Sequence, residues 1–408
     1  MEFDWSPEDE AFRGALRAFL AERLPESWEE ISKGGPGSEA QLDFSRAFCA
    51  DLAARGWLTP HWPAAWGGSE ASAWRHWVLS EELWAAGEPR GSQYMNVNWI
   101  GPAIMQFGTE EQKRLHLPAI AAGRALWCQG FSEPNAGSDL AALRTRADRE
   151  GPGGDDDVYV VNGQKIWTSY CNRADSCFLL VRTLAGSRRH RGISVLLVPM
   201  DLPGIEVREI PSIVGERYFH EVFFRDVRVP VACRLGPEHE GWDVVAHALA
   251  YERVGAARYA RAARTLDALV ARAADDGAFD GDDAERALAR LEPLAEAIAE
   301  CEAARLLAWR VIDGRAKGEP PSVATNLARV AGTNADKRAG ELAVEFEALR
   351  ARAPGDALAY GSFADANFRL SMTAGVAVGA TEVQLDQIAR RHLGLPREPA
   401  PRPAKDGG

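Results

Sequence analysis

Apolar residues in the first third of the chain recur at the spacing of amphipathic helices. Ser6 stands where a helix N-cap belongs, and Pro7 and the acidic residues after it suit the first helical turn. The apolar positions that follow are three or four residues apart: Phe12, Leu16, Phe19, Leu20 and Leu24. This pattern predicts a helix that ends before Pro25. Similar patterns predict helices over 42–52 and 71–86 and a further helix that begins at a Thr109 capping box.

The pattern changes after Gly123. Short segments rich in β-branched or aromatic residues follow one another between turn residues, with no helical pattern between them. These segments are 126–131, 158–162, 177–182, 193–199, 205–210 and 219–229. They predict a small antiparallel β-barrel or sandwich.

After Pro230 the pattern is helical again. Alanine-rich stretches with leucines at helical spacing cover 240–272, 283–316, 323–351 and 365–392, which predicts an antiparallel four-helix bundle. We therefore expect a mixed α and β protein that is mainly α. Its predicted parts are an N-terminal helical domain (1–123), a middle antiparallel β-barrel or sandwich domain (124–235), a C-terminal four-helix bundle (236–393) and a proline-rich, disordered tail (394–408).

Charge and composition narrow the function classes. The 408 residues carry a formal net charge of −12, which argues against nucleic acid as a partner. No stretch of 18 apolar residues and no signal peptide is present, so we expect neither a membrane span nor secretion. The six cysteines form no C-x-x-C pair, which favours reduced thiols in a cytoplasmic protein, and no metal site is expected.

Two polar motifs carry candidate chemistry. The first is a glycine-containing loop, Gln129-Gly130-Phe131-Ser132-Glu133-Pro134-Asn135-Ala136-Gly137-Ser138-Asp139. Its hydroxyls and backbone N–H groups can cradle a pyrophosphate or the polar edge of a flavin, although an ordinary β-connection has the same composition. The second motif is Gly163-Gln164-Lys165-Ile166-Trp167-Thr168-Ser169, in which an indole stands beside two hydroxyls. Such an indole can pack on a planar ring.

Together with Gly108-Thr109-Glu110-Glu111-Gln112-Lys113 and Tyr251-Glu252-Arg253, these motifs resemble the acyl-CoA dehydrogenase family over almost the whole chain. The resemblance implies bound FAD and oxidation of an acyl thioester to the trans-2-enoyl thioester. It also implies an acyl-CoA or acyl-carrier-protein substrate, an electron-transfer flavoprotein or other acceptor, and a homo- or hetero-oligomer, either dimer or tetramer. The residues that it places at the cofactor are Gln129, Phe131, Ser132, Gly137, Ser138, Trp167, Thr168 and Ser169. Those that it places at the substrate are Ser138, Tyr251, Arg253, Gly379, Arg188 and Arg191.

The reaction needs a carboxylate that removes the α-proton of the thioester. Many family members supply it near the C-terminus, where this chain has Val378. Others place it on the first bundle helix before an arginine, and Glu252 occupies that position. We therefore expect Glu252 to be the base, although a Glu252–Arg253 ion pair is the structural alternative. Glu382 has the wrong helical phase and is the less favoured candidate.

Two family segments that contact FAD across a subunit interface are missing here. A Gly-Gly segment has no counterpart in 348–360, and an arginine–phenylalanine–glycine segment has none around 272–283. Part of the cofactor site can therefore come from a different partner chain. This leaves a weakly active partner subunit as an alternative function. A flavin monooxygenase or oxidase on the same fold is a second alternative, but Glu252 argues against it.

A basic cluster, Arg188-Arg189-His190-Arg191, lies between two predicted strands. It can be a solvated hairpin tip or a contact for the 3′-phosphate of coenzyme A.

Overall fold

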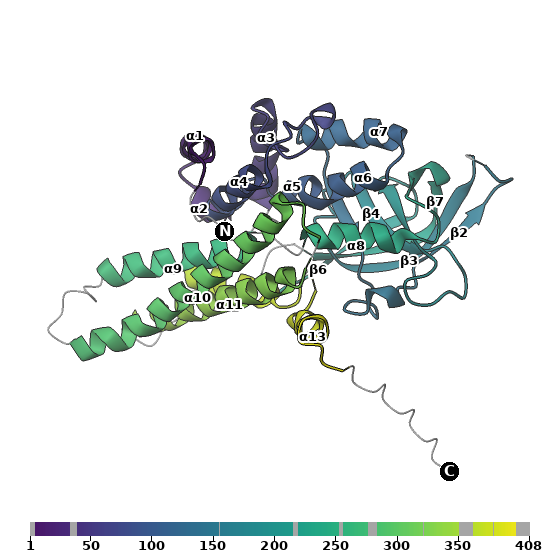
Figure 1. Ribbon diagram of the computed structural model, residues 1–408. Coiled ribbons are helices and arrows are strands. Elements are labelled where there is room, and N and C mark those ends of the chain that lie inside the picture. Colours follow the sequence, from purple (N-terminus) through teal and green to yellow (C-terminus); the bar gives the residue numbers. More distant parts are fainter. Residues whose placement is uncertain are drawn as a thin grey trace, which may run out of the picture.

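The computed structural model describes residues 5–32, 39–154, 156–214, 219–252, 256–275, 284–320, 322–350, 362–377 and 379–396. Helices come first, a sheet follows, and helices return. In Figure 1 the N-terminal helices lie at the top, the sheet at the right and the long helices at the lower left. The mainly helical fold with a β-sheet in the middle of the chain, as predicted, is confirmed.

Side-chain caps fix where several N-terminal helices begin. The Ser6 hydroxyl accepts a hydrogen bond from the Asp9 N–H (3.1 Å) at the start of α1. Thr109 and Gln112 form the predicted capping box at the start of α7. The elements of this region are α1 (Pro7–Arg23), α2 (Trp28–Ser32), α3 (Glu39–Ala54), η1 (Ala64–Trp66), α4 (Ala73–Ala85), α5 (Gln93–Met95), the π-helical turn η2 (Asn96–Ile100), α6 (Gly101–Phe107) and α7 (Glu110–Ala121). Of these, α2, α5, η2 and α6 have no counterpart in the sequence prediction.

The middle of the chain forms one eight-stranded sheet with the order β6-β7-β3-β2-β4-β5-β8, and β1 pairs with β4. Most pairs are antiparallel, as expected, but β1 runs parallel to β4, and β2 also meets β4 in parallel. The predicted antiparallel arrangement therefore holds for all pairs except those of β1 and β2 with β4. The long β2–β3 hairpin separates β1 from β4 in sequence, so no tight turn imposes an antiparallel pair there. The strands are β1 (Trp127–Gly130), β2 (Arg146–Glu150), β3 (Val158–Ser169), β4 (Ser176–Arg182), β5 (Ile193–Pro199), β6 (Ile205–Ile210), β7 (Phe219–Pro230) and β8 (Arg234–Leu235); short 3-10 turns lie at η3 (Leu140–Ala142) and η4 (Val231–Cys233).

The C-terminal helices are α8 (Gly241–Glu252), α9 (Ala257–Asp275), α10 (Ala284–Ala316), α11 (Ala324–Arg350), α12 (Phe363–Ala374) and α13 (Thr381–Arg391). The single helix expected over 240–272 is described as two, α8 and α9. The single helix expected over 365–392 is wrong, because the chain leaves helical geometry after Ala374. Gly379 has a φ of +91° there, in the left-handed region that favours glycine. The predicted tail beyond residue 396 lies outside the described residues.

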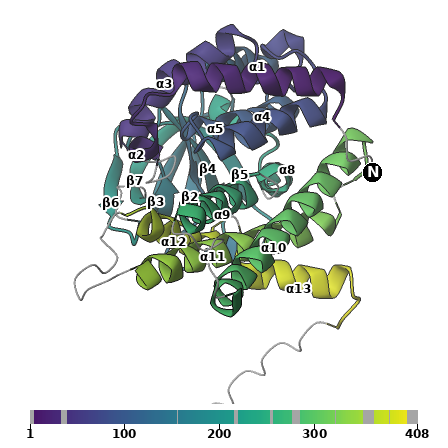
Figure 2. The same cartoon turned by 90° about the vertical axis from the view of Figure 1, so that its left-hand side faces the viewer.

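Three apolar cores hold these layers together. One joins the N-terminal helices to β1, β4, β5 and α8 and includes Phe48, Phe178 and Val244. A second lies inside the bundle and reaches α4 through Trp77. The third fills the other face of the sheet. Figure 2 shows the N-terminal helices above, with the bundle helices α9 to α11 beneath them and the strands behind. The N-terminal helices, the sheet and the bundle therefore meet near α4, η2 and α8.

In the part of the chain that the structure describes, no helix is both long enough and apolar enough to cross a bilayer. All six cysteines are free thiols, and all except Cys233 are buried.

Candidate active site

A buried ion pair fixes the polar loop after β1. The Lys165 ammonium on β3 donates to the Glu133 carboxylate (2.9 Å) and to the Phe131 carbonyl (3.1 Å). Glu133 also accepts from the backbone N–H groups of Arg144 (2.6 Å) and Thr145 (2.8 Å). These bonds join the loop to strand β3. Both charged groups are buried.

The protonation states of this pair follow from burial and mutual attraction. Burial opposes the charge on Glu133, but the Lys165 ammonium and the donated N–H bonds outweigh it and lower the pKa of the carboxyl. Burial lowers the pKa of Lys165, and Glu133 offsets part of that effect. The sequence marks the two residues as members of two motifs, but only the structure shows that one motif holds the other.

A bulge in β3 turns Trp167 outward. The register against β7 shifts between Lys165 and Thr168, and Trp167 has a φ of +58°, which is uncommon for an aromatic residue. The indole is 55% exposed and packs edge-on against Phe219. The sequence gives no signal of this bulge.

Unpaired polar atoms accompany the exposed indole. Thr168 Oγ1 and Gln129 Nε2 are buried and have no hydrogen-bond partner. Ser132 and Ser169 are partly exposed, Ser138 is exposed, and a side chain at Gly137 would meet no atom within 4 Å. A planar heteroaromatic ring with polar edges suits an outward indole beside an unsatisfied amide and hydroxyl. The residues present therefore fit a flavin.

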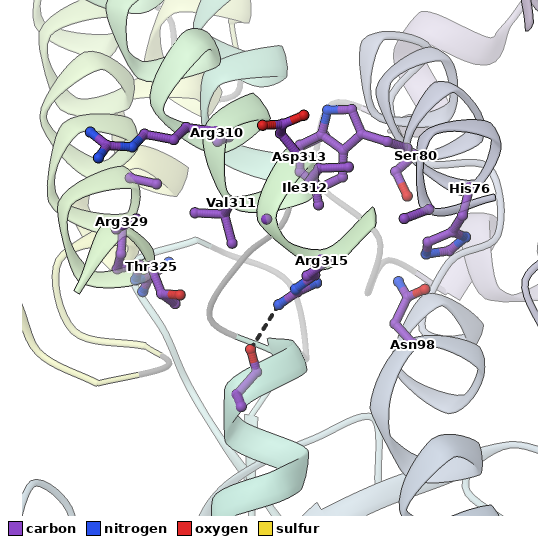
Figure 3. Close-up of a pocket in the computed structure, with 18 of the residues that line it drawn as sticks. His76, Ser80, Asn98, Arg310, Val311, Ile312, Asp313, Arg315, Thr325 and Arg329 are labelled. Carbon is purple, nitrogen blue, oxygen red and sulfur yellow. Dashed lines mark hydrogen bonds between the residues drawn. The ribbon is translucent and has the colours of Figure 1, made fainter. Parts of the chain in front are cut away.

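The predicted base stands at the end of α8. The main chain is fixed just before it, because the Arg315 guanidinium donates to the Ala250 carbonyl (3.0 Å; Figure 3). Glu252 is the last residue of α8. The side chains of Tyr251 and Glu252, and all of Arg253 and Val378, lie outside the described residues. Gly379 lies between α12 and α13, where a Cβ would come within 2.6 Å of the Gln384 amide.

The basic cluster lies in an ordered connection between β4 and β5. Arg182 donates to the carbonyls of Arg189 (3.3 Å) and Arg191 (2.9 Å), which holds the connection from inside. The His190 ring stacks on Trp242 of α8, with centroids 4.1 Å apart. The side chains of Arg188, Arg189 and Arg191 are exposed. The connection is thus a supported basic tip, and sequence reasoning missed both of its supports.

A cavity of about 960 Å³ lies between the N-terminal helices and the bundle. Its walls come from α4 and η2 on one side and from α9, α10 and α11 on the other (Figure 3). Ala250 and Ala256, on either side of the predicted base in sequence, both line it. None of the predicted flavin residues does. Sequence reasoning missed this cavity, because the residues that line it are far apart in the sequence. One of the elements that line it, the π-helical turn η2, is of a kind that is frequent at functional sites.

The fold and the polar loop beside the exposed indole fit a flavoprotein, and comparison with known proteins gives the family. The chain matches the models of the acyl-CoA dehydrogenase N-terminal domain over residues 6–124, the middle domain over 128–227 and the C-terminal domain over 239–393. The acyl-CoA dehydrogenase IpdE1 of Mycolicibacterium smegmatis is 35% identical over 96% of this chain and 99% of its own length. The acyl-CoA dehydrogenase FadE26 of Mycobacterium tuberculosis is 35% identical over 97% and 99%.

Solved structures give the same answer. The Tcur3481-Tcur3483 steroid ACAD matches with a TM-score of 0.85 and 31% identity over 98% of this chain and 100% of that one. The ChsE4-ChsE5 complex from Mycobacterium tuberculosis matches with a TM-score of 0.82 and 34% identity over 98% and 100%. The chain belongs to the acyl-CoA dehydrogenase family and is an FAD-dependent oxidoreductase.

Proposed function

We propose that this chain catalyses α,β-dehydrogenation of an acyl-CoA thioester to the trans-2-enoyl thioester, with Glu252 as the base. The observation that carries the proposal is the position of Glu252. It ends α8, and Ala250 and Ala256, close to it in sequence on either side, line a cavity large enough for an acyl group. A thioester whose acyl part enters this cavity would bring its α-carbon near the end of α8.

Each part of the site then has a role. Glu252 accepts the α-proton, and Arg315 fixes the main chain that carries it by bonding the Ala250 carbonyl. FAD, when bound, would supply the hydride acceptor that the reaction needs. Trp167 would pack on the flavin ring, and Gln129, Thr168 and Ser169 would bond its polar edge. Ser132, Ser138 and Phe131 bind the flavin or the pantetheine arm, and Gly137 leaves room for their close approach. Tyr251, Arg253 and Gly379 border the thioester.

The competing carboxylate is less suitable. Glu382 lies in the first turn of α13, where it is exposed and lines none of the cavity. This supports Glu252 over Glu382 as the base.

The similar proteins suggest a substrate class and an assembly. Two matching solved structures carry the names of two chains each, and one is called a steroid ACAD. We infer that this chain acts on a bulky, polycyclic acyl-CoA and works beside a second family member that completes the FAD site. The chain lacks the two family segments that contact FAD across a subunit interface, and this also favours a second chain at the cofactor. Much of the sequence at those positions lies outside the described residues. We further propose that the protein acts on this acyl-CoA in the cytoplasm.

The test of the base is the substitution Glu252→Gln, which retains size and hydrogen bonding but cannot accept the proton. The FAD-loaded variant should bind acyl-CoA yet transfer the hydride at least about 100-fold more slowly, as followed by bleaching of the flavin absorbance in single turnovers. Glu382→Gln is the matched control and should behave as the wild type. Near-normal bleaching in Glu252→Gln would refute the assignment, whereas loss of FAD or of folding would indicate a structural ion pair.

A second candidate is a partner subunit without a complete site of its own. The absent interface segments favour it. It would be established if this chain bound no FAD in any assembly, and if Glu252→Gln left the activity of that assembly unchanged.

A further inference from the structure

The cavity between the N-terminal helices and the bundle holds unsatisfied polar atoms. Nδ1 of His61 and Nε of Arg258 are buried and make no hydrogen bond, whereas the side chains of His76 and Asn98 interact with each other. All four residues line this cavity. Buried polar groups in proteins are normally paired, and exceptions need a reason.

One wall of the cavity is polar but uncharged. The rings of His61 and His76 lie with their centroids 3.7 Å apart. Burial, together with Arg90 and Arg315, lowers the pKa of His61 to about 3, and burial and His61 lower the pKa of His76 as well. Both imidazoles are therefore neutral near pH 7, and each offers one N–H donor and one acceptor nitrogen.

The other wall is cationic. The Arg258 side chain is 15% exposed, and the carboxylate nearest to it, Asp336, is 4.0 Å away. Asp336 already accepts a hydrogen bond from Arg261, with 2.8 Å between Arg261 Nε and Asp336 Oδ1. Arg329, also on this wall, adds like charge, and burial, Arg329 and Arg261 all act to lower the pKa of Arg258. Two acidic residues also line the cavity, Asp313 and Glu319, but neither neutralises the positive charge of Arg258. Asp313 accepts a hydrogen bond from Lys317 (2.7 Å), and Glu319 is exposed.

We propose that this cavity selects acyl groups that carry oxygen substituents remote from the thioester. An acceptor oxygen, either a carboxylate or a ketone, binds the Arg258 Nε–H, and a further polar substituent binds the His61, His76 and Asn98 wall. A plain hydrocarbon chain would leave the His61 nitrogen and the Arg258 Nε–H unsatisfied, whereas an oxygenated acyl group pairs them. The inference deepens the proposed function and rests on it, because it assumes that the acyl part enters this cavity.

The phosphates of FAD and coenzyme A are the other anions available. They do not explain the unsatisfied atoms, because no predicted flavin residue and no residue of the basic tip lines the cavity. The charge therefore faces the acyl part.

The experiment uses the FAD-loaded protein in the assembly that retains the cofactor. It compares three acyl-CoA thioesters of equal chain length: the alkanoyl-CoA, its ω-carboxy analogue and its ω-oxo analogue. We expect kcat/KM, and the affinity measured by calorimetry, to be at least about tenfold higher for one or both oxygenated thioesters. Preference for the carboxy over the oxo compound identifies an anion, and equal preference identifies a hydrogen bond without a charge requirement.

Arg258→Met should reduce this preference to about threefold or less, because it removes the donor while it keeps most of the side-chain volume. Arg338→Met is the matched control: Arg338 lies on α11, outside the cavity, with Glu341 and Glu345 as its partners, and its loss should leave the preference unchanged. If circular dichroism shows that Arg258→Met is unfolded, Arg258→Lys replaces it. Lysine keeps the charge without Nε, so the preference must still fall.

Two outcomes overturn the inference. One is equal kcat/KM and equal affinity for all three thioesters, and the other is a preference that persists in the folded Arg258 variant. Failure of the proposed function looks different, because no thioester then bleaches the flavin. Calorimetry still ranks the three thioesters in that case and decides the inference by itself.

Discussion

The imidazoles of His61 and His76 lie with their centroids 3.7 Å apart and their planes inclined by 38°. They line the cavity, and they remain neutral because burial prevents their protonation. A group that the folded state keeps unprotonated, but the unfolded chain protonates, links stability to pH.

We predict that the protein loses stability as the pH falls below 6.5. The folded-state pKa of His61 is about 3 against an ordinary value of 6.5. Between these values the unfolded chain binds a proton that the folded chain does not, so stability rises with pH. Each such imidazole contributes a slope of about 1.4 kcal/mol per pH unit in this window. Denaturant unfolding at pH 7.0, 6.0 and 5.0 measures it.

In this measurement His61→Asn should have a shallower pH slope than the wild type. The matched control is His392→Asn, which replaces an exposed histidine after α13. Parallel slopes in the wild type and His61→Asn would contradict the prediction.

At the scale of elements, the basic tip between β4 and β5 joins a fixed main chain to exposed side chains. Arg182 and the His190–Trp242 stack fix its main chain, and three guanidinium groups project from it into solvent. A fixed main chain with free cationic side chains suits a phosphate ligand.

We predict that the triple replacement of Arg188, Arg189 and Arg191 by Gln raises KM for acyl-CoA by about tenfold or more. The same variant should change KM much less for the thioester of dephospho-CoA, which lacks the 3′-phosphate. Arg228→Gln on β7, an exposed arginine that pairs with Glu150, serves as the control. An equal rise in KM for both thioesters, or no rise, would show that the cluster is only a solvated hairpin tip.

Elements were predictable where their signals were local. Ser6 and the Thr109–Gln112 box mark helix starts that the structure confirms, because caps act within three residues. The break between α12 and α13 was missed, since alanine-rich periodicity continues on both sides of Gly375 and Gly379. The parallel β1–β4 pair was missed because it is decided by tertiary packing.

The candidate site shows the same division. Each of the two proposed flavin motifs is contiguous, so the sequence could single out Gln129, Trp167 and Thr168, whose role at the cofactor stays a prediction. The bulge that turns Trp167 outward depends on the register of β3 against β7, which periodicity does not encode. His76, Asn98 and Arg258 come from α4, η2 and α9, so only folding brings them to one cavity.

At the scale of the whole molecule, the surface around Trp167, where we propose that the flavin binds, is open in the part of the chain that the structure describes, since the indole is more than half exposed. The N-terminal helices, the sheet and the bundle of this one chain leave that surface uncovered. A second chain is the natural cover for it, and the matching two-chain assemblies give the proposal its form.

We predict that the chain retains little FAD when expressed alone and substantially more when co-expressed with a complementary family member, because a second chain supplies the missing interface contacts. Gel filtration with the ratio of 450 nm to 280 nm absorbance measures assembly and occupancy together. Trp167→Ala should lower occupancy in the complex, whereas Trp74→Ala, on α4, whose indole packs against Trp5 and Trp309, should not. Full occupancy in the isolated chain would favour a homo-oligomer.

The Glu133–Lys165 pair has a consequence for the thermodynamics of cofactor capture. Because the Lys165 ammonium and the two N–H groups of Arg144 and Thr145 already hold the loop and the strand together, little main-chain freedom remains to be lost when a ligand binds to them. Association with this half of the site should therefore show a small entropy penalty. Any large ordering entropy seen in calorimetry of cofactor uptake would then originate in the other half, where the bundle and a neighbouring chain close over the ligand.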